Sequence, residues 1–222
     1  MAVDFNQSIT KLIEELPSVR AGHYYPATSD LTEEELENVY GSTVSVLEKY
    51  GVKVLIDQIP EAPEIAGWAS AQSNELMVNP AGEIHEVIAS LIHEVAHFWT
   101  QRHQKTWIYV GGSFLRTEIA AEIPAYIVCE VLGIDTVQMS AEYLRRCGRN
   151  FHKNTSYMAH LIEQERSDIL LVTSNILREL RKELEGLPVY EKQNPFIALQ
   201  LEEIVFPVPL RIQLEQEPIS FL

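Results

Sequence analysis

Cysteine and positive charge are both scarce in this 222-residue sequence. Its two cysteines, Cys129 and Cys147, are too few for a disulfide framework, and neither belongs to a Cys-x-x-Cys pair. Each lies near a helix-like apolar run, so we expect buried, reduced thiols and a reducing, cytoplasmic compartment. The 17 basic side chains are outnumbered by 32 acidic ones, which leaves a net charge of −15 spread along the chain. Because such a field repels phosphate groups, we expect no direct nucleic-acid binding.

Long apolar runs are missing as well. No stretch approaches the roughly 20 residues that a membrane-spanning helix needs. Acidic residues interrupt the first 16 positions, which therefore do not resemble a signal peptide. We expect no association with membranes, while the oligomeric state stays open. With 46% hydrophobic and 22% charged residues, the composition is ordinary for a globular protein, and the length suits one domain.

Hydrophobic periodicity and turn residues predict a small sheet followed by a helical half. Strands are expected over residues 52–59, 66–71 and 75–79, the last two forming a hairpin. Helices are expected over residues 6–16, 32–50, 84–101, 115–132, 138–148 and 156–185. Thr32 and Glu35 have the spacing of a capping box, which marks the start of the second helix.

These elements predict an α+β fold in one domain that spans residues 1–222. A small antiparallel or mixed sheet would pack on the helix over residues 84–101, with a helical C-terminal half. Residues 1–50 would form an N-terminal helical extension, residues 66–185 the core, and residues 187–222 a C-terminal arm that contains prolines.

The helix over residues 84–101 contains a His-Glu-x-x-His motif, formed by His93, Glu94 and His97. Because residues four apart share a helix face, both imidazoles can bind one cation at Zn–N distances of about 2.0–2.1 Å. Glu94 is rotated by about 100° from His93, which places it beside the metal and near a metal-bound water. Zinc lowers the pKa of that water to about 7, and a carboxylate can pass its proton to a departing amine. The alternative is a pair of core histidines on an amphipathic helix.

A catalytic zinc ion also needs a third protein ligand and an open position. The next helix offers Glu118 and Glu122, which are four residues apart and share a face. One can bind the zinc while the other orients a histidine through its second ring nitrogen. The apolar residues around them indicate a buried face, where unpaired carboxylates are costly. Taken alone, two exposed acids would be the simpler interpretation.

Three segments carry a family resemblance. The first runs from Gly67 to Thr100 and includes the histidine motif, the second is Phe114–Ile123 with Cys129–Ile134, and the third is Tyr157–Ile162. Together they resemble the zincin-like metallopeptidase domain of antirestriction protein C, over about half of the chain (residues 67–185).

The resemblance implies a zinc ion held by His93, His97 and Glu118. In this family the third ligand is a glutamate that alanine follows three positions later, and Glu118 with Ala121 fits that register. Glu122 then falls where related glutamate-type zincins keep an acidic or amide residue that supports a histidine ligand.

Two features depart from the family pattern. The family often has a Gly-His pair after Trp-Thr, where this chain has Gln101-Arg102-His103. The basic single-stranded-DNA-binding domain of the family is also absent, since residues 1–50 carry three basic and nine acidic side chains. DNA binding is therefore not implied for this chain.

Peptide cleavage also needs a donor for the oxyanion of the tetrahedral intermediate. Tyr157 is preferred because it opens the third matching segment. The other candidates are His103, Tyr109, His152 and His160.

A substrate backbone needs an edge strand with which to pair. The strand over residues 75–79 directly precedes the motif helix and is the natural choice, with an ordinary hairpin strand as the alternative. Trp68, Trp99 and Trp107 fit core positions better than pocket walls.

The predicted function is zinc-dependent hydrolysis of a protein or peptide substrate, with Glu94 as general base and then general acid. One alternative is a latent or degenerate zincin that acts as an acidic, antirestriction-like protein-binding module. The other is a purely structural zinc site, in which the glutamate of the motif has no task.

Overall fold

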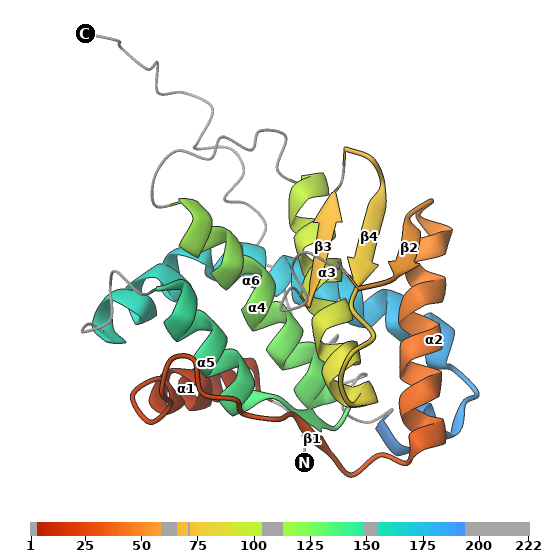
Figure 1. The fold of residues 1–222 in the computed structure, drawn as a ribbon, viewed down its shortest axis with the longest axis horizontal. Coiled ribbons are helices and arrows are strands. Elements are labelled where there is room, and N and C mark those ends of the chain that lie inside the picture. The colour runs from red at the N-terminus through yellow and green to blue at the C-terminus, as the bar shows by residue number, and fades with distance from the viewer. Residues whose placement is uncertain (1–3, 59–65, 71, 104–112, 149–154, 194–222) are drawn as a thin grey trace, which may run out of the picture.

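Figure 1 shows the computed structural model of the chain, which describes residues 4–58, 66–70, 72–103, 113–148 and 155–193. These residues form an α+β fold, and every predicted helix and strand that falls on them is present within a few residues of its predicted bounds. The elements are, in chain order, α1 (Phe5–Glu15), β1 (Thr28–Ser29), α2 (Glu33–Lys49), β2 (Lys53–Ile56), β3 (Gly67–Ser70), β4 (Glu75–Val78), α3 (Ile84–His103), α4 (Ser113–Val131), β5 (Ile134–Asp135), α5 (Val137–Cys147) and α6 (Thr155–Leu184).

Helix α2 begins where the sequence predicts, because both bonds of the capping box form. The Glu35 backbone N–H donates to the Thr32 hydroxyl, and the Glu35 carboxylate accepts from the Thr32 backbone N–H. Such a box satisfies two backbone donors that have no partner inside the helix.

Strands β2, β4 and β3 form a mixed sheet in that order. β2 runs parallel to β4, and β3 runs antiparallel to it through a hairpin that turns at Asn74. The φ of 53° at Asn74 lies in the left-handed region, which asparagine tolerates better than most residues. The prediction that residues 75–79 form an edge strand is wrong, because β2 pairs with the side of β4 that the hairpin leaves free. Among the residues that the structure describes, the edges of the sheet are β2 and β3.

Helix α4 lies between two hydrophobic cores. One of its faces packs with α2, α3, the sheet and the second half of α6, and the opposite face packs with α1, α5 and the first half of α6. Ile119 and Ile123 are fully buried on the second face, and each contributes about 1.5–3 kcal/mol by its burial. Burial on both faces explains why α4 is apolar almost all round. Its two glutamates are consequently buried too.

Strands β1 and β5 were not predicted. They pair antiparallel, with Thr28 opposite Asp135 and Ser29 opposite Ile134. Two residues are too few to display an alternating pattern in the sequence. The short ladder ties the segment between α1 and α2 to the turn that separates α4 from α5.

The predicted C-terminal arm begins inside the fold. Residues 188–193 are helical, and Val189 and Tyr190 are buried in the core that contains α2 and α3. The remainder of that prediction, residues 194–222, lies outside the described residues. Cys129 and Cys147 are free thiols, as expected, the first buried and the second partly buried. None of the described helices is long and apolar enough to cross a membrane.

Candidate metal centre and adjoining cavity

Helices α3 and α4 pack against each other and carry the candidate site between them (Figure 1). The motif lies in the middle of α3, where Ile92 and Val95 are almost fully buried and fix the helix against the core. The remaining face presents His93 and His97, whose rings meet edge to face with centroids 4.6 Å apart. The helical period predicted from the sequence therefore places both imidazoles together.

Glu118 on α4 completes a group of three donors with these two histidines. Its Oε2 atom lies 3.6 Å from His93 Nε2 and 3.5 Å from His97 Nε2. The three donor atoms all lie within 4.8 Å of one another, and they form a possible metal site within the part of the chain that the structure describes. A single oxygen of Glu118 thus faces the Nε2 atoms of both histidines.

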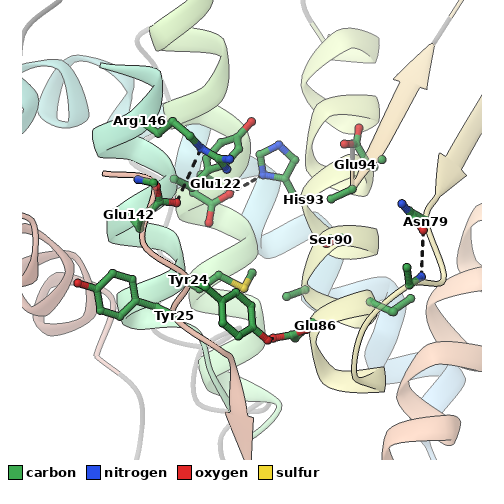
Figure 2. Close-up of a pocket in the computed structure, with 18 of the residues that line it drawn as sticks. Tyr24, Tyr25, Asn79, Glu86, Ser90, His93, Glu94, Glu122, Glu142 and Arg146 are labelled. Atoms are coloured by element: carbon green, nitrogen blue, oxygen red, sulfur yellow. Dashed lines mark hydrogen bonds and ion pairs between the residues drawn. The ribbon is translucent and has the colours of Figure 1, made fainter. Parts of the chain in front are cut away.

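Glu122, one turn further along α4, contacts the other nitrogen of the first histidine. Its Oε2 lies 2.6 Å from His93 Nδ1, and both side chains are buried (Figure 2). In a neutral His93 this contact favours a proton on Nδ1, which leaves the lone pair of Nε2, on the side of Glu118, free to bind a metal ion. The two glutamates, which the spacing alone could not distinguish, therefore lie on different nitrogens of His93.

The charges at this centre favour a cation between the three donor groups. Burial alone would lower the pKa of His93, but hydrogen bonds to Glu118 and Glu122 raise it to about 10. Burial alone would raise the pKa of Glu118, but its hydrogen bonds with His93 and His97 hold that pKa well below its usual range. Either a proton on an imidazole or a bound metal ion supplies the positive charge that such an arrangement needs.

Glu94 is buried without a partner. Its side chain is 7% exposed and makes no hydrogen bond or ion pair to any residue that the structure describes. Burial raises the pKa of Glu94, although His93 and His97 act in the opposite direction. The carboxylate lies beside Gly67 of β3, and a Cβ atom at that glycine would stand 2.8 Å from Glu94 Cγ. The absence of a side chain at Gly67 is what leaves room for Glu94.

Tyr143 on α5 belongs to the site, although the sequence analysis did not select it. Its hydroxyl donates to Glu118 Oε2 at 2.5 Å, and its ring meets the His93 ring with centroids 5.1 Å apart. Burial and then the neighbouring Glu118 raise the pKa of this phenol, so it remains a donor at neutral pH. Helical spacing places Met139, Tyr143 and Arg146 on one face of α5, but nothing in the sequence indicates that this face turns toward α3.

A cavity of about 640 Å³ adjoins the candidate metal centre (Figure 2). Its walls come from α3, α4, α5, the start of β3, the turn after β4 and the segment before β1. The lining residues are Gly22, His23, Tyr24, Tyr25, Ala66, Gly67, Asn79, Ala81, Glu86, Val87, Ala89, Ser90, His93, Glu94, Glu122, Met139, Glu142, Tyr143 and Arg146. The cavity therefore reaches His93 and Glu94 directly, while His97 and Glu118 are not among its lining residues.

Residues 22–25 cross this cavity between α5 and α3, and we call them the strap. At one end the Gly22 backbone N–H donates to Glu142 Oε1 at 2.6 Å. At the other end the Tyr24 hydroxyl donates to Glu86 of α3. Tyr24 is 68% exposed, so its hydrogen bond rather than burial holds it across the opening. The sequence predicts neither a helix nor a strand over these residues.

The remaining predicted candidates do not lie in the described site. Tyr157 is in the first turn of α6, 36% exposed, and is not among the residues that line the cavity. His160 is exposed and pairs with Gln164 on its own helix. Tyr109 and His152 lie outside the described residues, as does the side chain of His103.

The two tryptophans that the structure describes do not line the cavity either. Trp99 is a core residue in ring contact with Tyr50 and Phe98, as the sequence predicts. Trp68 is partly buried in β3 and is not among the lining residues, and Trp107 lies outside the described residues.

Comparison with protein-family models, with curated proteins and with solved structures found no match to this chain.

Proposed function

We propose that this chain is a zinc-dependent metallopeptidase of the zincin type. In this proposal His93, His97 and Glu118 hold the metal, and Glu122 orients His93. Glu94 is the general base and then the general acid. The resemblance of the motif segments to the antirestriction protein C peptidase domain supports the same assignment.

The chemistry of the donor set fits zinc. Two imidazole nitrogens and one carboxylate oxygen are the ligands of many catalytic zinc sites, and they leave the fourth tetrahedral position open. Bonds of 2.0–2.1 Å in a tetrahedron separate neighbouring ligand atoms by about 3.3–3.4 Å. The two histidine-to-Glu118 separations of 3.6 and 3.5 Å are close to that value. A bound zinc ion would supply a polarising charge and a water whose pKa falls from about 15.7 to about 7.

The carboxylate of Glu94 carries the proposal, because it is largely buried, lines the cavity and has no hydrogen bond or ion pair to a described residue. Removing most of a carboxylate from water is costly, so one that lines a cavity without a partner fits a group that acts on a molecule in that cavity. A purely structural site gives Glu94 no partner and no task. In a hydrolase it faces the reacting water, takes a proton from it and returns that proton to the leaving amine.

The cavity and the edge strand provide places for a polypeptide substrate. β3 is at the edge of the sheet, and its first residue, Gly67, lines the cavity beside Glu94. An extended peptide can add to such an edge by main-chain hydrogen bonds. Its scissile bond would then lie near Glu94, with a neighbouring side chain in the cavity. The proposed substrate is accordingly an extended segment of a protein or a peptide.

The test compares wild-type protein with Glu94→Gln and His97→Ala. We expect about one zinc per chain in wild type and in Glu94→Gln, and little in His97→Ala, by elemental analysis. Cleavage of a peptide library should fall by about 10²–10⁴-fold in Glu94→Gln, the usual contribution of a general base. Glu83→Gln is the matched control, because it removes an exposed carboxylate just before α3 that does not line the cavity.

Three results would contradict the proposal. If wild type binds zinc and Glu94→Gln cleaves the library as fast as wild type does, Glu94 is not the base. If wild type binds zinc but cleaves no library member, the chain is a latent zincin, and its acidic surface favours a role as a binding module. A chain that unfolds on chelation and cleaves nothing would instead have a structural site.

A further inference from the structure

Tyr143 connects the two helices that carry the proposed ligands. Its hydroxyl donates to Glu118 of α4, and its ring edge contacts His93 of α3. The guanidinium carbon of Arg146 lies 5.3 Å from the centre of the same ring, over its face. One side chain of α5 thus contacts two of the three proposed ligands and is itself held in place by a third neighbour.

The hydrogen bond from Tyr143 ends on the Glu118 oxygen that is the proposed metal ligand. Oε2 of Glu118 accepts from Tyr143, and the same atom faces Nε2 of both histidines. A carboxylate oxygen has two lone pairs, so the phenol can use one while the other remains free for a cation. The bond therefore does not compete with metal binding.

A glutamate side chain has three rotatable torsions, and an unrestrained carboxylate can turn either oxygen toward a metal or swing away from it. Fixing such a chain costs conformational entropy. If a hydrogen bond already fixes the carboxylate before the metal binds, less of this entropy is lost on metal binding. Glu122 has the same relation to His93, whose Nδ1 it contacts.

We propose that Tyr143 is a positioning residue that holds Glu118 Oε2 toward His93 and His97 and so raises the affinity of the site for zinc. This inference depends on the proposed metal site, but it does not depend on peptide hydrolysis. Loss of a hydrogen bond that orients a metal ligand typically lowers metal affinity by about 10–100-fold. The same range is expected for Tyr143→Phe, which keeps the ring and removes only the hydroxyl.

The experiment measures zinc affinity by competition with a chromophoric chelator, and the visible absorption of the Co²⁺-substituted protein. We expect a zinc Kd about 10–100-fold higher in Tyr143→Phe than in wild type, with an altered Co²⁺ spectrum. Tyr126→Phe is the matched control. It removes the hydroxyl of a buried tyrosine on α4 whose charged neighbours are Glu130 and Asp135 instead of the proposed ligands, and it should change neither quantity.

A third variant with 4-aminophenylalanine at position 143 returns an N–H donor to the same place. It should recover most of the lost zinc affinity, whereas a mere packing defect would not respond to the donor. Thermal unfolding of each chelated variant checks that it is folded. If Tyr143→Phe does not fold, the 4-aminophenylalanine variant still tests the proposal, because its affinity should lie near that of wild type.

The proposal is overturned if Tyr143→Phe binds zinc within twofold of wild type and gives the same Co²⁺ spectrum. It is also overturned if Tyr126→Phe loses as much affinity, since the effect is then general loosening. Wild type that binds zinc but cleaves no peptide contradicts the proposed peptidase and leaves the Tyr143 test intact. Wild type that binds no zinc contradicts both.

Discussion

The substitution Gly67→Ala tests whether the position of Glu94 is set by the sheet. Gly67 opens β3, and its backbone needs no unusual φ, so only space argues for glycine here. A Cβ atom would lie 2.8 Å from Glu94 Cγ, 3.2 Å from its Oε1 and 2.8 Å from the carbonyl oxygen of Met77. Ordinary carbon–carbon contacts lie at about 3.5–4.0 Å. The Met77 carbonyl belongs to the neighbouring strand, so relief of both clashes needs a shift of the β3 backbone as well as a movement of the glutamate.

The required movement is about half an ångström or more at the Glu94 side chain. Overpacking of this kind typically costs about 1–3 kcal/mol of folding free energy. For a chain of this size that corresponds to a fall in Tm of roughly 2–12 °C. Misplacement of a catalytic group by about 1 Å can cost on the order of 10²-fold in rate. We therefore expect a large loss of cleavage with a modest loss of stability.

The assay measures Tm, zinc content and peptide cleavage for Gly67→Ala. Zinc content should stay near that of wild type, because none of the three proposed ligands touches the new methyl group in the contacts around Gly67. The matched control is Gly41→Ala in α2, where an added Cβ meets nothing within 4 Å. That change should stabilise the protein by up to about 1 kcal/mol and leave cleavage unchanged. Wild-type cleavage by Gly67→Ala would refute the idea that β3 sets the position of Glu94.

Two further predictions concern His93. Glu122→Ala should raise the zinc Kd by about 10–100-fold, because His93 Nδ1 loses its acceptor. Glu122→Gln should lose less zinc affinity, because an amide oxygen still accepts a hydrogen bond. Chelator competition measures both affinities, and equal values in wild type and the two variants would contradict the role of Glu122. After chelation, thermal stability should fall as pH rises from about 6.5 toward 10. The pKa of His93 is raised to about 10 in the folded chain, so the protonated imidazole stabilises the fold fully below the unfolded pKa and loses that effect at high pH. A Tm that is flat or rising across this window would refute the shift, and zinc should abolish the decline by replacing the proton.

Local chemistry made most of the helices and part of the site predictable. The capping box at Thr32 is a short-range signal and appears where it was expected. His93 and His97 share a face because the helical period alone requires it. Buried carboxylates on α4 could be expected from the apolar residues that surround them, and Glu118 and Glu122 are both buried.

Features that depend on which elements become neighbours were not predictable. The periodicity of residues 138–148 gives the helix and its faces, but it does not reveal that Tyr143 turns toward Glu118. The hairpin of β3 and β4 is local, whereas the pairing of β2 with β4 joins strands from different parts of the chain and decides which strand is central. The role of Gly67 likewise exists only because β3 passes beside Glu94.

The strap and the proposed reactive residues come from different parts of the sequence. Residues 22–25 form one wall of the cavity, yet every proposed zinc ligand and the proposed base lie between positions 93 and 118. Mutations in the strap can therefore reshape what enters the cavity while the reactive groups stay untouched. If the chain is the proposed peptidase, changes in this short exposed segment would alter which substrate enters the cavity without changing the proposed ligands or the proposed base.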